Sequence, residues 1–252
     1  MKFLKFTLVI LVFFTNTYAQ ITLAVAANVQ FAMQELKDEF KKETRVDVSI
    51  IIGSSGQFTA QIKQGAPYDI FISADMKYPN SLYQSKLAIS APKVYASGSL
   101  VIWSVKKGIK FDKKLSFLLS DNIKRIAIAN PAIAPYGEAT IEVLKHYKIY
   151  DKIKNKLVYG ESISPTNQFI LSGAADAGFT AKSVVVSPQM KGKGVWMEID
   201  PSVYTPIEQG CVILKYGIDH HKNDSIRFYN FLFSKKAKDI LRNFGYQVKG
   251  NK

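Results

Sequence analysis

The sequence has a single cysteine, Cys211, among its 252 residues. One cysteine cannot form a disulfide within the chain, and no cysteine stands near the N-terminus to carry a lipid. Cys211 lies in the apolar run 210–214, which is typical of a small core residue rather than of a nucleophile. After residue 19, no apolar run approaches the length of a membrane-spanning helix. We therefore expect a soluble chain without disulfides.

Sequence motifs for nucleotides and metals are also missing. There is no GxxxxGK[ST] or GxGxxG, and no CxxC or HExxH accompanies the histidines. The adjacent pair His220 and His221 is predicted to lie in a loop before a helix that starts at Asp224, and His146 on the surface of another helix. We expect no cofactor and no resident metal.

Acidic residues are scarce relative to basic ones, and the formal net charge is +14. The lysines are spread along the chain and form no arginine-rich tract or basic–aromatic motif, so nucleic acid is not an expected partner. A positive surface favours encounter with small anions. Lysines that only keep the surface solvated explain the charge equally well, and both interpretations stay open.

Residues 1–19 have the features of a secretory signal peptide. Lys2 and Lys5 form a basic start, the run 6–14 is apolar, and 17–19 ends in the small residue that a signal peptidase reads. The apolar run is too short to span a bilayer comfortably. We expect cleavage before Gln20 and a periplasmic location.

The rest of the chain alternates short apolar strands with amphipathic helices, which predicts parallel βαβ units and an α/β fold. The alternation restarts after a long apolar strand near residue 100. We therefore expect two lobes facing each other across a cleft, one formed by 20–100 with 205–252 and the other by 101–204. The expected strands are 21–26, 46–52, 68–72, 100–105, 125–129, 157–159, 177–180 and 210–214, and the expected helices are 29–44, 56–64, 136–147, 165–172, 224–233 and 234–244.

Four of the strand-to-helix junctions carry small polar residues or proline. Asn28 and Ser54 are predicted N-caps, Pro165 is predicted as the first residue of its helix, and Tyr136 opens a fourth helix. A helix start offers unpaired N–H groups and the positive end of the helix dipole. Capping alone explains any one junction, but four at strand ends in both lobes predict an anion site in the cleft.

Several of these segments resemble one family. Ala26-Ala-Asn28, the Ser-Ser-Gly that follows the second strand, and above all Gly65-Ala-Pro-Tyr-Asp-Ile-Phe-Ile-Ser-Ala-Asp75 are similar to the periplasmic molybdate-binding proteins. The resemblance continues through Asn130-Pro131, 135–137, 161–163 and 204–207, and so covers nearly the whole chain after residue 19. It implies the type II periplasmic binding protein fold, a mixed and mostly parallel sheet in each lobe, and a monomer that delivers molybdate or tungstate to the membrane permease of an ABC transporter.

The resemblance also implies a ligand set. In the first lobe the oxyanion ligands would be Asn28 and Ser55, by side chain and backbone N–H, and in the second lobe the backbone N–H groups of Tyr136 and Ile163. Molybdenum would be bound only as the oxyanion. One branch of the family donates a tyrosine hydroxyl from the position of Ala181, which has none to give, so the ligand set is closer to the branch with asparagine in the first loop.

Neutral donors suit a fully deprotonated tetrahedral dianion. Hydrogen phosphate carries a proton that needs an acceptor, and leaving it unpaired costs about 1–3 kcal/mol. Sulfate is as fully deprotonated as molybdate, so a receptor for sulfate or another tetrahedral oxyanion is one alternative. The other is a secreted hydrolase, in which Asp69 and Asp75 would be the acid and base; without a nucleophile–base set in the sequence, we expect no enzyme.

Overall fold

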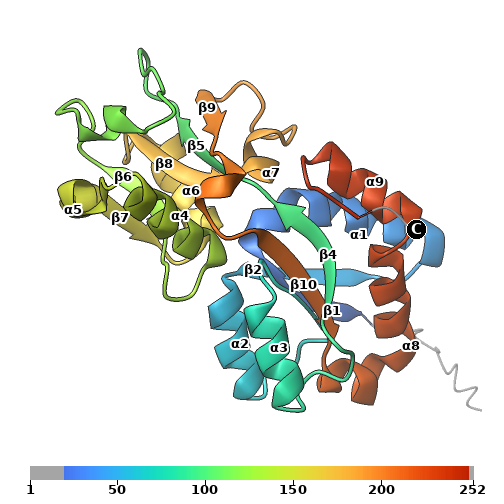
Figure 1. Cartoon of the computed structure of the whole chain (residues 1–252). Helices are drawn as coiled ribbons and strands as arrows, with labels where there is room; N and C mark the ends of the chain where they lie inside the picture. Colours follow the sequence, from blue (N-terminus) through green and yellow to red (C-terminus); the bar gives the residue numbers. More distant parts are fainter. Residues whose placement is uncertain (1–19, 250–252) are drawn as a thin grey trace, which may run out of the picture.

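The computed structural model describes residues 20–249, so the predicted signal peptide 1–19 lies outside the described residues. The chain folds into two lobes, each built on one five-stranded mixed sheet with helices against its faces (Figure 1). This is the two-lobed α/β architecture that the sequence predicts. Within the described residues, no helix is both long and apolar enough to cross a bilayer.

The sheet of the first lobe has the strand order β2-β1-β3-β10-β4. Strands β1 and β2 are parallel, as are β1 and β3, whereas β10 runs antiparallel to both of its neighbours. Because β10 returns from the far end of the sequence, the lobe is made of two separate segments of the chain. The strands are β1 (Ile21–Ala26), β2 (Val48–Gly53), β3 (Ile70–Ile72), β4 (Lys93–Gly98) and β10 (Ile207–Ile213).

The sheet of the second lobe repeats this design with the order β7-β6-β8-β5-β9. Strand β6 is parallel to β7 and β8, and β5 is antiparallel to β8 and β9. The strands are β5 (Leu100–Ser104), β6 (Ile126–Ala129), β7 (Leu157–Gly160), β8 (Ala177–Ala181) and β9 (Val195–Glu198).

Helices cover both faces of each sheet. In the first lobe they are α1 (Gln30–Thr44), α2 (Ser55–Lys63), α3 (Lys77–Gln84), α8 (Lys215–Leu232) and α9 (Lys235–Asn243). In the second lobe they are α4 (Pro135–His146), α5 (Tyr150–Ile153), α6 (Ile163–Leu171) and α7 (Lys182–Val185). Short 3-10 turns complete the lobes: η1 (Ala27–Val29), η2 (Ser116–Leu119), η3 (Lys154–Lys156) and η4 (Pro201–Val203).

The alternation of side chains along the strands divides the first lobe into two apolar layers. Leu23 and Val25 pack in the cluster that holds α1, α8 and α9, while Ala24 between them packs toward α2 and α3. Phe40 of α1 lies 5.0 Å from Phe228, ring centre to ring centre, which joins α1 to α8. Figure 1 shows these two groups of helices on opposite faces of the sheet.

The structure corrects three sequence predictions. Helix α6 begins at Ile163, so Pro165 is its third residue rather than its first; proline fits there because the N–H groups of the first turn have no partner within the helix. Helix α8 begins at Lys215, well before Asp224, and has non-helical backbone angles at His221. The adjacent histidines therefore lie within a kinked helix and not in a loop. The sequence prediction also missed α3, β4 and β9 and the short helices α5 and α7.

Candidate functional site

A small cavity lies between the lobes, at the carboxyl ends of the parallel strands. Ala26 pairs with Gly53, and Ala129 pairs with Gly160, so the strands of each pair end level with each other. The helices that follow therefore start side by side and point their N-termini into the same space. The residues lining the cavity are Ala26, Ala27, Asn28, Gly53, Ser54, Ser55, Ala74, Ala134, Pro135, Tyr136, Ser162 and Ile163.

The structure brings all four sequence-predicted site residues to this cavity. Asn28 and Ser55 come from the first lobe, and Tyr136 and Ile163 from the second. Each of them is at most 3% exposed. None of the lining residues, all within 20–249, carries a charged side chain. A ligand in this cavity would meet backbone amides, hydroxyls, the side-chain amide of Asn28 and apolar groups, but no charged side chain.

Ser54 and Ser55 have different roles at the start of α2. Ser54 caps the helix, because its hydroxyl oxygen accepts the N–H of Gln57 at 3.3 Å, as the sequence predicts. The Ser55 hydroxyl oxygen accepts the N–H of Ala74 at 3.0 Å. This bond uses a lone pair of Ser55 and leaves its O–H hydrogen free to donate, while the N–H of Ser55 belongs to the unpaired first turn. Ser55 can therefore give two donors to one guest.

The second lobe contributes two further helix starts. Pro135 is the first residue of α4 and has no N–H, so Tyr136 carries the first amide of that helix. Ser162 precedes α6, and its side chain makes no capping bond to the helix. The Ile163 N–H and the Ser162 hydroxyl are thus both available at the cavity wall. Sequence reasoning missed Ser162 as a site residue, because the helix was predicted to begin at Pro165 and only the structure places Ser162 at the N-cap position.

Asn28 corrects another prediction, because it does not cap α1. It lies in η1, and its side-chain Nδ2 donates to Gln209 Oε1 at 2.9 Å and to the Tyr246 hydroxyl at 3.0 Å. Its buried Oδ1 has no hydrogen-bond partner among residues 20–249. Burial raises the pKa of the Tyr136 and Tyr246 hydroxyls, so both keep their protons at neutral pH.

Hydrogen bonds across the cavity rim hold the two lobes together. The Gly56 N–H donates to the carbonyl of Ile133 at 2.9 Å, and Ser183 Oγ donates to the carbonyl of Asn28 at 2.7 Å. Farther out, Ser164 Oγ donates to Gln30 Oε1 at 2.8 Å. Each of these bonds joins one lobe to the other, so the structure shows the closed form of the cleft.

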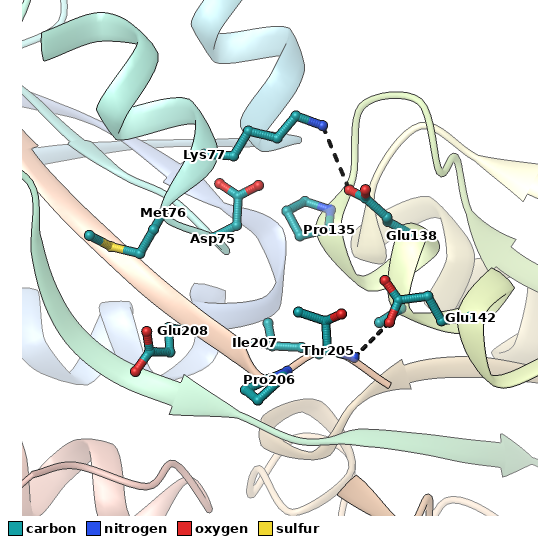
Figure 2. A pocket seen from close by; sticks show the side chains of 11 residues that line it. Asp75, Met76, Lys77, Pro135, Glu138, Glu142, Thr205, Pro206, Ile207 and Glu208 are labelled. Atoms are coloured by element: carbon teal, nitrogen blue, oxygen red, sulfur yellow. Dashed lines mark hydrogen bonds and ion pairs between the residues drawn. The ribbon is translucent and has the colours of Figure 1, made fainter. Parts of the chain in front are cut away.

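A larger groove of about 340 Å³ runs beside the cavity along the same seam (Figure 2). Lys77 faces Glu138 across it at 3.8 Å, and Glu142 Oε2 accepts the N–H of Thr205 at 2.6 Å. Asp75 and Glu208 also line the groove, so it holds four carboxylates and one lysine. Its negative charge makes it a poor place for an anion, and the smaller neutral cavity is the better candidate.

The structure separates the two aspartates of the hydrolase alternative. Asp69 precedes β3 and is buried, with Oδ2 accepting the N–H of Thr22 at 2.6 Å and Oδ1 lying 2.8 Å from His221 Nδ1. Asp75 follows the other end of β3, where partial burial raises its pKa. With a whole strand between them, the two carboxylates cannot act on one bond.

The cysteine, the tryptophans and His146 lie away from the cavity. Cys211 is buried in the core of the first lobe, as predicted. Trp103 is buried in the second lobe, Trp196 lies partly exposed on β9, and His146 is exposed at the end of α4. Within residues 20–249, no cluster of histidine, cysteine, aspartate and glutamate is arranged to hold a metal ion.

The chain is similar to known proteins over most of its length. Residues 21–247 match the family described as bacterial extracellular solute-binding protein. The molybdate-binding protein ModA of Rhodobacter capsulatus is 36% identical over 228 residues, which cover 90% of this chain and 88% of that protein. The solved periplasmic molybdate-binding protein of Azotobacter vinelandii is 34% identical, with a TM-score of 0.86 over 91% of this chain and 100% of that one.

A more distant likeness concerns the fold alone. The sulfate-binding protein SubI of Mycobacterium tuberculosis has a TM-score of 0.74 at 16% identity, covering 91% of this chain and 86% of that one. The molybdate-binding proteins of Rhodobacter capsulatus and Azotobacter vinelandii confirm the family resemblance that was based chiefly on residues 65–75. The chain belongs to the bacterial extracellular solute-binding protein family.

Proposed function

We propose that this protein binds molybdate in the cavity between its lobes and delivers it to the membrane permease of an ABC importer. The observation that carries the proposal is the convergence of three helix starts and η1 on one buried cavity with no charged side chain. The molybdate-binding relatives, which align over nine tenths of the chain, support the same ligand.

The proposed contacts are hydrogen-bond donors. Ser55 would donate through its hydroxyl and its N–H, Tyr136 and Ile163 through their N–H groups, and Asn28 through its N–H and side chain. The Ser162 hydroxyl is a further candidate. Each donor bond to a dianion contributes roughly 1.5–3 kcal/mol, and the helix dipoles add favourable potential without a fixed charge.

Tungstate has the same shape and charge as molybdate, and we extend the proposal to it. Sulfate is the second candidate, because it is also a fully deprotonated tetrahedral dianion and the sulfate-binding protein SubI shares the fold. A donor-only cavity does not separate these anions by protonation, so their discrimination must come from size.

The cellular setting is part of the proposal. Residues 1–19 would direct secretion and be removed, which would place the protein in the periplasm. We propose that it acts there as a monomer, as the family resemblance implies. We also infer that it catalyses no reaction and needs no cofactor, since its relatives are binding proteins and Asp69 and Asp75 lie apart. We also propose lobe boundaries near residues 100 and 205, because the chain passes from one sheet to the other near these positions.

Calorimetric titration against molybdate, tungstate, sulfate and hydrogen phosphate tests the proposal, with a variant that removes one donor. Ser55→Ala should weaken molybdate binding roughly 10- to 150-fold, the equivalent of one charge-assisted hydrogen bond. The matched control is Ser104→Ala, because Ser104 is also fully buried and also accepts a backbone N–H, from Lys106 at 3.0 Å, but lies outside the cavity. Equal affinity for molybdate and sulfate, or unchanged binding by Ser55→Ala, would contradict the proposal.

A further inference from the structure

Gln209 is the centre of a buried polar network that lies behind the cavity and includes side chains of both lobes. Its Oε1 accepts from Asn28 Nδ2 at 2.9 Å and from the Tyr95 hydroxyl at 2.7 Å, and its Nε2 donates to the Tyr136 hydroxyl at 3.1 Å. Gln209 is fully buried but does not line the cavity. It touches the site only through Asn28 and Tyr136, one from each lobe.

The backbone is shaped to place this side chain. Strand β10 has a bulge between Gln209 and Gly210 in its pairing with β4, and bulges re-aim side chains beside functional sites. Gly98, at the end of β4, leaves the space that the network occupies. A Cβ on Gly98 would lie within 2.5 Å of Gln209 Nε2 and still closer to the Tyr136 hydroxyl.

The network leaves the acceptor oxygen of the Asn28 amide, and not its donor nitrogen, without a partner. Both hydrogens of Nδ2 are used, one by Gln209 and one by the Tyr246 hydroxyl, and only the acceptor Oδ1 is unpaired. An oxyanion has no hydrogen to give to that oxygen. Asn28 can donate its side-chain N–H to an oxyanion only if the amide rotates by half a turn, which exchanges two ends of nearly equal size.

We propose that Gln209 is a positioning residue that reverses together with the Asn28 amide when the oxyanion binds. After reversal, Gln209 Nε2 donates to Asn28 Oδ1, and Asn28 Nδ2 is released to donate to the oxyanion. This inference rests on the proposed function and adds to it the residue that sets the polarity of the site.

The neighbouring hydroxyls accommodate the reversal because each can donate or accept. Tyr136 changes from acceptor to donor toward Gln209 Oε1. Tyr95, which now donates to Oε1, would accept from Nε2 and turn its own hydrogen to the carbonyl of Ser73, 3.4 Å away. Tyr246 would donate to Asn28 Oδ1 while Ser183 keeps its bond to the Asn28 carbonyl. Burial keeps these tyrosines protonated by raising the pKa of each.

Lobe closure is coupled to the same switch. Tyr136 belongs to the second lobe, whereas Asn28 and Gln209 belong to the first. The bond between Gln209 and the Tyr136 hydroxyl therefore exists only while the lobes are together. Closing the cleft gives the second polar atom of Gln209 a partner in either orientation of the amide. The oxyanion, which accepts hydrogen bonds only, then selects the orientation in which Asn28 donates to it.

A double-mutant cycle on molybdate affinity tests the proposal, because a role in stability alone would lower the melting temperature without changing the affinity. Gln209→Met keeps the length of the side chain and removes both polar atoms, and it should weaken molybdate binding about tenfold. In an Asn28→Ala background, the same substitution should change the affinity less than twofold, since Gln209 then has no amide to orient. Tyr136→Phe, which keeps the backbone N–H, should also be non-additive with Gln209→Met.

The control and the outcomes separate this proposal from the proposed function. Ser225→Ala removes a buried hydroxyl from α8, away from the cavity, and should lower the melting temperature without changing the affinity. Additive effects of Gln209→Met and Asn28→Ala would overturn the positioning role, as would full affinity in Gln209→Met. If the unsubstituted protein fails to bind molybdate, the proposed function falls instead, independently of the cycle.

Discussion

Gly56 lies where the closed cleft leaves little room between the two lobes. A Cβ added at Gly56 would lie 2.7 Å from the Tyr78 hydroxyl oxygen and 2.9 Å from both Cα and O of Ile133. The Tyr78 hydroxyl can move aside, because it is the far end of a flexible side chain. The Ile133 atoms cannot, because they belong to the backbone of the opposite lobe. The Gly56 N–H also donates to the Ile133 carbonyl, so Gly56→Ala would push apart the two groups that this bond joins.

The substitution should have opposite effects on folding and on binding. Alanine is a better helix former than glycine by roughly 1 kcal/mol, and Gly56 lies in the first turn of α2, so the first lobe by itself should not lose stability. The overlap with Ile133 arises only when the lobes close, and overpacking of this kind costs about 1–3 kcal/mol. If closure and binding are linked, molybdate affinity should fall by roughly 5- to 150-fold.

Calorimetric titration of Gly56→Ala with molybdate measures this effect, with thermal unfolding of the ligand-free protein beside it. Gln57→Ala is the control, because Gln57 lies on the same helical turn but its side chain is exposed, and its N–H is bonded to Ser54 of the same lobe. Wild-type affinity in Gly56→Ala would refute the link between closure and binding. A large loss of ligand-free stability would show instead that the contact holds the fold together.

Three further results follow from the burial of single side chains. Partial burial raises the pKa of Asp75, so the folded protein holds this proton more tightly than the unfolded chain; Asp75→Asn should raise the melting temperature at pH 7, and the gain should vanish as the pH falls below about 4. Burial also raises the pKa of the Cys211 thiol, so a thiol reagent at pH 8 should label it only after denaturation. His221→Ala removes a partner of the buried Asp69 carboxylate and should lower the urea-derived free energy of unfolding by about 1–3 kcal/mol while leaving molybdate affinity unchanged.

The positions of the site residues could be predicted from the sequence because they lie where one element ends and the next begins. A buried apolar strand followed by Gly53 and small polar residues marks a helix start, and the parallel arrangement brings such starts to one edge of each sheet. Local signals of this kind need no knowledge of distant contacts. They predicted Ser54 as the cap, whereas Ser55 as a ligand was implied by the family resemblance.

The bonding of the site could not be predicted in the same way. The partners of the Asn28 amide, Gln209 and Tyr246, are 181 and 218 residues away in the sequence, so an asparagine before a helix looked like an ordinary N-cap. Pro165 misled for a related reason, since proline suits any position of a first turn and the true start at Ile163 depends on where β7 ends. The kink at His221 coincides with the contact between its ring and Asp69, and that contact is likewise set by the tertiary fold.

The contrast between a strongly basic chain and a neutral cavity has a physical reason. Charge on the surface raises the rate of encounter with anions and is indifferent to their shape. A lysine inside the cavity would attract hydrogen phosphate as well as molybdate, and would slow the release that delivery requires. N–H and O–H groups stabilise an oxygen only along their own direction, so helix starts from two lobes favour one arrangement of oxygens. In the proposed function, surface lysines would favour the capture of an anion, and a cavity lining without lysine would favour its selection.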